Sequence, residues 1–320
     1  MPPCLRVGEA SALPSNGNRP ERTRRWRMTL VDEWQARAVI ESPPKDVAFL
    51  QRAELAWMFV TIPVLQVAAA CGERNPNSPV GPERRSQVEY DIARDFFSKG
   101  QPRLALQHCR TAVELDDQNA DASYFASVVH LSFCDQRPLE LESPDCHLPE
   151  AEKYVRRALS INPKFRDAEN TLGQILILEK KYPEAIAVLE PLTKDPAFES
   201  ANLAWGNLGW AQVLAGQVNE GIESLKNAIT EPRFCVGHYR LGMAFEKKGD
   251  LPSAEQSLTN ALEVDDPKCK GLQDAWEARG FLRMKLGKAE DGRADLVRCR
   301  DIAADTAAGK ACAAALGKTP

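Results

Sequence analysis

The sequence predicts an all-α fold, a superhelical solenoid of six helix–turn–helix repeats with a C-terminal capping helix. Residues 166–197 show the repeating unit most clearly. Apolar residues spaced three and four apart on both sides of Pro183 predict two amphipathic helices with a break between them. Gly173 in the first helix and Ala185 in the second are small enough to let antiparallel helices touch. Units of this length bury their apolar faces by stacking on one another.

Two small-residue markers recur along the chain in step with each other. The second-helix marker recurs with spacings of 46, 34, 36, 33 and 38 residues, close to the period of about 34 that tetratricopeptide repeats show. It occurs at Ala105, Ala151, Ala185, Gly221, Ala254 and Gly292. The first-helix marker occurs at Ala93, Ser127, Gly173, Gly209, Gly242 and Gly280. Because the two markers stay in register over six units, an irregular helical bundle is the weaker alternative.

The region before the repeats divides into three segments. Residues 1–46 are rich in Arg, Pro and polar residues and fit no part of the repeat pattern. We expect them to be a disordered leader or a start-site error, and a basic interaction arm is the alternative. Residues 47–70 have the character of a lipoprotein signal segment. Residues 71–85 carry several Pro and Gly residues among polar ones, which predicts an extended tether before the repeat domain of residues 86–320.

The apolar run at residues 55–70 carries no charge and ends in three alanines followed by Cys71. It is shorter than the roughly 20 residues of a membrane-spanning helix, but its basic flank and small-residue end are typical of a secretory signal. The ending resembles the lipobox of bacterial lipoproteins, although that pattern prefers Leu at the position of Ala68. The resemblance implies cleavage before Cys71 and lipid attachment to it, and Gly72 favours sorting to the outer membrane. A buried N-terminal helix that ends in Cys is the alternative.

The repeats follow in order from residue 86. The first covers about residues 86–119, and the second begins near Ala120 with about 12 residues more than the period of the array. That excess lies between its two helices, in a Pro-rich loop. The third and fourth repeats are the most regular, and the fifth and sixth follow with the same markers. A last helix over residues 307–316 is predicted to cover the apolar edge of the sixth repeat.

The cysteines favour an oxidising compartment. Cys4 lies in the leader and Cys71 at the lipobox, which leaves seven in the repeats. Six of these form local pairs that a short loop or antiparallel helices would bring together: Cys134 with Cys146, Cys235 with Cys269, and Cys299 with Cys312. Cys109 remains at a core position. Free thiols are the alternative that spacing does not exclude.

No residue pattern indicates catalysis or metal binding. The chain lacks a nucleophile elbow, a P-loop and a dinucleotide-binding fingerprint, and it has no CxxC or HxxxH spacing. Its net charge is −4 and it has no basic stripe of the kind that nucleic-acid binding requires. We therefore predict a protein that is not an enzyme, with no cofactor, metal, nucleic-acid partner or small-molecule substrate.

The first helices of the repeats carry a second apolar stripe, which a tetratricopeptide frame places on the concave face. Such a stripe needs a partner unless it is core packing, which is the alternative. The predicted partner-binding residues are Tyr90, Phe97, Tyr124, Val128, Leu131, Ile177, Trp210, Val213, Tyr239, Met243 and Phe281.

A lipobox, a short tether and six tetratricopeptide repeats together resemble the pilotin lipoproteins of type IV pilus machines. The resemblance covers the chain from Cys71 to the C-terminus. It implies a protein anchored by lipid on Cys71 at the periplasmic face of the outer membrane, where it would bind secretin subunits and promote their assembly into a pore. The alternatives are a scaffold lipoprotein for peptidoglycan enzymes and an intracellular co-chaperone adaptor.

Overall fold

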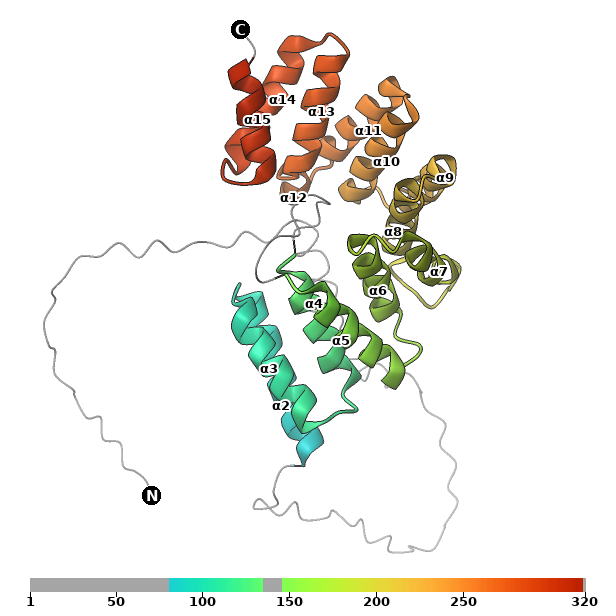
Figure 1. Ribbon diagram of the computed structural model, residues 1–320, viewed down its shortest axis with the longest axis vertical. Helices are drawn as coiled ribbons and strands as arrows, with labels where there is room; N and C mark the ends of the chain where they lie inside the picture. Colours follow the sequence, from blue (N-terminus) through green and yellow to red (C-terminus); the bar gives the residue numbers. More distant parts are fainter. Residues whose placement is uncertain (1–80, 135–145, 319–320) are drawn as a thin grey trace, which may run out of the picture.

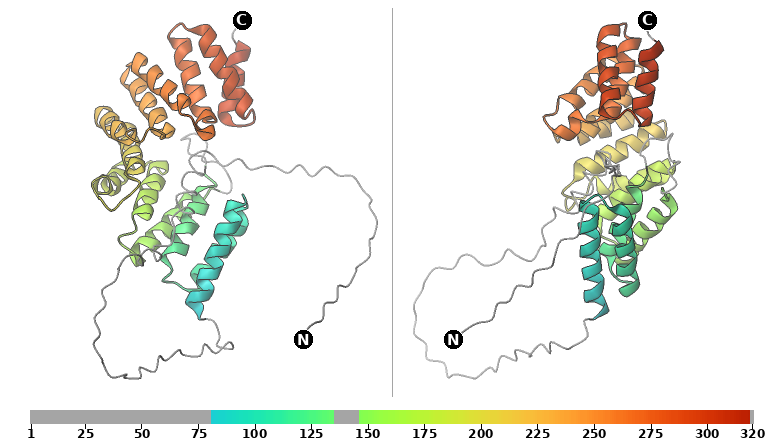
Figure 2. Two further views of the ribbon diagram at one scale, coloured as in Figure 1. Left: turned by 180° about the vertical axis from the view of Figure 1, so that it is seen from behind. Right: turned by 90° about the vertical axis from the view of Figure 1, so that its left-hand side faces the viewer.

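The computed structural model describes residues 81–134 and 146–318 of the 320-residue chain. Within these ranges the protein consists of fourteen α-helices, and no strand occurs in them. The helices stack one after another into a curved array (Figures 1 and 2). The predicted all-α solenoid is confirmed. The leader, the signal segment and Cys71 lie outside the described residues.

Six antiparallel helix pairs, one short helix and one terminal helix make up the array. The pairs are α2 (Pro82–Ser98) with α3 (Pro102–Leu115), α4 (Ala120–Leu131) with α5 (Leu148–Ile161), α6 (Arg166–Leu178) with α7 (Tyr182–Leu192), α8 (Ala201–Leu214) with α9 (Val218–Ala228), α10 (Cys235–Lys248) with α11 (Leu251–Glu263), and α13 (Gln273–Lys285) with α14 (Ala289–Ile302). The short helix α12 (Pro267–Lys270) was not predicted, and α15 (Ala307–Lys318) is the predicted terminal helix.

Several helices begin at or next to a proline, which loses nothing there because the first helical N–H groups have no partner. Pro102 opens α3 and Pro183 lies in the first turn of α7. Pro82 opens α2, so the expectation that the tether stays extended to residue 85 is wrong for its last four residues. The side chain of Asn119 caps α4 by accepting a hydrogen bond from the amide of Ala122 at 2.8 Å.

The turn between the two helices of a repeat uses a left-handed residue. Gly100, Gly216, Gly249 and Gly287 all have positive φ there. The third repeat has Lys180 in this place, with a φ of 62°. A residue with a Cβ is strained in that conformation, so Lys180 is an exception in an otherwise glycine position.

The small-residue markers are points of close helix contact. A Cβ built on Gly173 would lie 2.5 Å from the Leu189 side chain, which packs from α7 onto α6. The same contact recurs in α10, where a Cβ on Gly242 would lie 2.7 Å from Leu258 of α11. These glycines therefore set the distance between the paired helices.

Three disulfides hold parts of the array together. They join Cys134 to Cys146, Cys235 to Cys269 and Cys299 to Cys312, which are the three predicted pairs. Their Cα–Cα distances are 4.6, 5.7 and 6.3 Å. Cys109 is a free thiol in the core, and burial raises its pKa to about 12, so it stays protonated at neutral pH.

Candidate partner-binding face

The first helices of successive repeats contact one another along the array, as the tetratricopeptide frame predicts. Contacts join α2 to α4, α4 to α6, α6 to α8 and α8 to α10. In the middle of the array, α6 and α8 lie on the inner side of the curve, and α7 and α9 lie on its outer side (Figure 1). The inner helices are therefore the place to look for the predicted stripe.

Most of the predicted stripe is core. Seven of its eleven side chains are buried: Tyr90, Phe97, Tyr124, Val128, Leu131, Ile177 and Val213. The expectation that these seven line an open surface is wrong, because each of the seven side chains is buried in the packing between helices. All residues from 122 to 131 in α4 are buried, as are all residues from 170 to 178 in α6. Their contribution to partner binding stays a prediction.

The other four predicted residues keep part of their surface open, and all lie in the second half of the array. Trp210 of α8, Tyr239 of α10 and Phe281 of α13 pack on the core but are only partly covered. Met243 of α10 is also partly exposed. The accessible part of the predicted stripe is thus the segment from α8 to α13.

A row of polar side chains, missed in the sequence, crosses three inner helices. The Asn207 amide of α8 donates from Nδ2 to Asn170 Oδ1 of α6 at 3.0 Å. Arg240 of α10 donates from Nη1 to Asn207 Oδ1 at 2.8 Å. All three side chains are buried. Asn170 and Asn207 are 37 residues apart, and Asn207 and Arg240 are 33 residues apart, which is close to the period of the repeat. The sequence signal for this row was therefore a polar residue at the same turn of three successive first helices.

Arg240 is a buried charged side chain whose hydrogen-bond partner is an amide and not a carboxylate. Its side chain is buried, with 8% of the residue exposed, and burial lowers its pKa to about 10. The guanidinium stays protonated at neutral pH. Among the described residues no carboxylate forms an ion pair with it, and Asn207 supplies its one hydrogen bond there.

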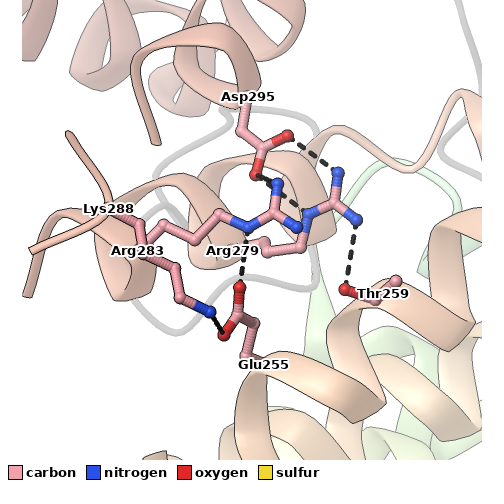
Figure 3. Close-up of polar contacts among 6 residues, drawn as sticks. All are labelled: Glu255, Thr259, Arg279, Arg283, Lys288 and Asp295. Atoms are coloured by element: carbon pink, nitrogen blue, oxygen red, sulfur yellow. Dashed lines mark hydrogen bonds and ion pairs between the residues drawn. The ribbon is translucent and has the colours of Figure 1, made fainter. Parts of the chain in front are cut away.

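A second buried arginine, Arg279, is paired with a carboxylate, as buried charges in proteins usually are. It donates from Nε and Nη2 to the two carboxylate oxygens of Asp295 at 2.9 and 2.8 Å (Figure 3). Arg283 adds a bond to the same carboxylate at 2.9 Å and another to Glu255 at 3.0 Å. Lys288 donates to Glu255 at 2.6 Å, and this bond is the main reason that the pKa of Glu255 lies below its ordinary value. The network joins α11, α13 and α14 and leaves its charges paired.

The described residues hold no group of three or more His, Cys, Asp and Glu side chains that could bind a metal ion. No helix in residues 81–134 and 146–318 has the length and apolar character needed to cross a bilayer.

Two solved structures of type IV pilus proteins share this architecture. PilW, described as a widely conserved type IV pilus biogenesis factor, superposes with a TM-score of 0.58 at 18% sequence identity, over 71% of this chain and 97% of PilW. PilF of Pseudomonas aeruginosa superposes with a TM-score of 0.53 at 14% identity, over 73% of this chain and 99% of PilF. This chain therefore spans nearly the whole length of both.

Other solenoids fit similarly well. A monomeric mutant of IFIT1, solved with Gppp-AAAA, superposes with a TM-score of 0.57 at 14% identity, over 71% of this chain and 52% of that one. No protein-family model matches the chain, and no curated protein does either. Together the likenesses show a tetratricopeptide-repeat solenoid, and at these identities they show the fold alone.

Proposed function

We propose that this protein is a type IV pilus biogenesis factor whose inner face binds secretin subunits and promotes their assembly in the outer membrane. One observation carries the proposal. Two neighbouring inner helices carry partly open apolar side chains, Trp210 on α8 and Tyr239 and Met243 on α10. Large aromatic side chains in such positions dominate binding energies at protein interfaces.

The length and architecture shared with PilW and PilF support a role in pilus biogenesis. The anchor is part of the same proposal. Lipid on Cys71 would hold the array at the periplasmic face of the outer membrane, where secretin subunits arrive. Stable anchoring of this kind needs more than one acyl chain, which a lipidated N-terminal cysteine supplies.

The test of the inner face is the Trp210→Ala variant. We expect it to copurify with less secretin and to reduce heat-resistant secretin multimers on a gel, while circular dichroism shows an unchanged helical content. Tyr182→Ala is the matched control, because Tyr182 is also partly exposed but begins α7 on the outer side of the curve. Normal multimer levels in a Trp210→Ala, Tyr239→Ala double variant would exclude the inner face as the working surface. Loss of helical content would instead identify Trp210 as a core residue.

The anchor is tested separately with Cys71→Ala. This variant should not be acylated and should leave the membrane fraction. If it still sediments with outer membranes, the lipoprotein part of the proposal fails and the inner-face part remains.

A further inference from the structure

The first repeat has exposed apolar side chains. Among the described residues, the large apolar side chains that are exposed are Val88 of α2, at 51%, and Leu104 of α3, at 40%. These two helices are the first of the stack, and α15 is the last (Figure 1). The exposed apolar surface is therefore confined to one end of the array.

Val88 lies at a position that is small and buried in every later repeat. It precedes the first-helix marker Ala93 by five residues. The residues at the same place before the other five markers are all buried: Ala122, Ala168, Ala204, Gly237 and Ala275. Each of them lies on a first helix that packs against the second helix of the preceding repeat. In repeat one, the position where a neighbouring helix packs thus carries a larger apolar side chain that is exposed.

Leu104 lies at a position that is polar in every later repeat. It precedes the second-helix marker Ala105 by one residue. The residues at the same place in the other five repeats are acidic or carry a hydroxyl: Glu150, Glu184, Glu220, Ser253 and Asp291. An acidic residue stabilises the first turn of a helix through the helix dipole. Leu104 gives up this contribution and exposes apolar surface, whereas the end repeat of a solenoid ordinarily has a polar outer face.

Both side chains belong to one surface, the end face. It consists of side chains spaced three and four apart on the two helices, with Glu114 at its edge: Arg84, Val88, Ile92 and Asp95 of α2, and Leu104, His108, Thr111 and Leu115 of α3. In its middle, the His108 ring stacks on Phe96 at 5.1 Å between centroids and bonds to Glu89 at 2.6 Å. Contacts within the repeat therefore fix the centre of the end face.

Opposite charges lie level with each other at one end of this face. Ser86 Oγ of α2 donates to the carbonyl oxygen of Ala112 in α3 at 2.7 Å, so the first turn of α2 is level with the last turn of α3. The first turn of α2 carries Arg84, and the last turn of α3 carries Glu114. Both side chains are exposed.

We propose that the end face binds the end face of a second copy of this chain, about a two-fold axis parallel to α2 and α3. Each α2 then lies on α3 of the partner subunit, and the four helices form an antiparallel bundle. Val88 and Leu104 are covered, and Arg84 meets Glu114 of the partner subunit. A two-fold axis perpendicular to the helices would instead bring Arg84 to Asp95 of the partner subunit, which Lys99 already neutralises within each copy.

The end face is large enough for a reversible dimer. Helix α2 has 17 residues and α3 has 14. At the helical rise they are about 25 and 21 Å long, and side by side they are about 20 Å wide. The two faces together bury about 900 Å², close to the lower limit of about 1,000 Å² for specific interfaces. We therefore expect a dimer that dissociates on dilution.

The inference goes beyond the proposed function and does not depend on it. A two-fold axis parallel to the helices leaves both copies of α2 pointing the same way. The chain therefore enters both copies from the same side of the dimer. If Cys71 carries lipid as proposed, the two anchors would reach one membrane.

The test is sedimentation velocity of the full chain over about a hundredfold range of concentration. We expect a monomer–dimer equilibrium, and in Leu104→Glu a Kd at least tenfold higher. This variant introduces the residue that repeats two, three and four have at the same position, so the fold should tolerate it. The matched control is Ala313→Glu, which adds the same charge to an exposed position on α15 at the other end of the array and should leave the Kd unchanged.

A charge exchange tests the orientation of the two copies. Arg84→Glu should weaken the dimer, and Arg84→Glu combined with Glu114→Arg should restore it, because each contact then regains a pair of opposite charges. Restoration by a second change also excludes misfolding as the cause of the loss.

Four results would overturn the proposal. They are a wild type that stays monomeric throughout, an unchanged Kd in Leu104→Glu, an equal loss in Ala313→Glu, and no restoration in the exchanged variant. The third would indicate head-to-tail association. If the wild type stays monomeric and Leu104→Glu lowers its binding to phospholipid vesicles, the end face contacts a membrane and not a second copy.

Discussion

Gly209 of α8 and Gly221 of α9 face each other at backbone contact. A Cβ on Gly209 would lie 2.8 Å from the carbonyl oxygen of Gly221, and a Cβ on Gly221 would lie 2.7 Å from the carbonyl oxygen of Gly209. The two helices of the fourth repeat therefore approach as closely as their main chains allow. Neither oxygen can move aside as the end of a flexible side chain could.

Gly221→Ala should lower the free energy of unfolding by about 2 kcal/mol, because overpacking against the backbone outweighs the gain in helix propensity of about 1 kcal/mol. Urea denaturation followed by circular dichroism measures the loss. Gly317→Ala is the control, since a Cβ there meets nothing within 4 Å and the same substitution should be neutral or stabilising. Equal stability of Gly221→Ala and the wild type would contradict the close contact.

Lys180→Gly should raise the free energy of unfolding by about 0.5–1 kcal/mol. Lys180 has a φ of 62° at a turn where four other repeats have glycine, and glycine removes the strain of the left-handed conformation. Thermal or urea denaturation records the change. Lys164→Gly provides the comparison, because Lys164 is an exposed turn lysine without positive φ and gains nothing from glycine. A destabilised Lys180→Gly variant would show that the strain is absent.

The Cys134–Cys146 disulfide closes a loop with a sequence separation of 12 residues. Replacing both cysteines with alanine should cost about 3 kcal/mol on the chain-entropy account of disulfide stabilisation. Mass mapping of protein purified without reductant should find only Cys109 alkylated after unfolding, among the seven cysteines of the repeats. Alkylation of Cys134 and Cys146 in that sample would refute the pair, whatever the stability of the double variant.

Acid should destabilise the array through His130. Burial is the main reason that its pKa falls from 6.5 to about 4, with Arg110 adding to the effect. Between these values the unfolded chain holds a proton that the folded chain excludes. The contribution to stability is therefore complete above pH 6.5 and is lost as the pH falls towards 4, by about 3 kcal/mol in all.

His130→Phe isolates this effect. The ring stacks on Tyr154 at 5.6 Å between centroids and its Nε2 has no hydrogen-bond partner among the described residues, so a phenyl ring can take its place. We expect the variant to lose less stability than the wild type between pH 6.5 and 4. Part of the slope should remain, because burial also lowers the pKa of His238. If the variant and the wild type lose the same stability between pH 6.5 and 4, His130 takes up a proton in the folded protein as readily as in the unfolded chain.

The sequence was sufficient for the features that depend on local pattern. Small residues marked the helix contacts, Pro183 marked the start of α7, and helix ends that lie side by side predicted the partner of Cys235. Lys180 was missed although the repeat pattern contained the signal: it precedes Ala185 by the same number of residues by which Gly216 precedes Gly221, and it has the positive φ of that glycine.

The candidate face was predicted less well because burial depends on neighbours that the pattern does not contain. Tyr124 and Trp210 both fit the apolar stripe, yet Tyr124 is enclosed and Trp210 is partly open. The pairing of Arg279 with Asp295 and the hydrogen bond of Arg240 to Asn207 arise from which side chains the stacked helices bring together. Periodicity gives the stacking order of helices but not the partner of one charged group.

The three disulfides have a mechanical consequence. Cys134–Cys146 lies within the second repeat, Cys235–Cys269 joins α10 to the short helix α12, and Cys299–Cys312 joins α14 to α15. Their sequence separations are 12, 34 and 13 residues, and none of the three joins one repeat to another. A force that pulls the two ends of the array apart would open the boundaries between repeats first and meet no covalent cross-link there. As the chain is stretched further, the residues between the two cysteines of each disulfide would add nothing to the extended length. They would contribute only after a reductant had broken the disulfide.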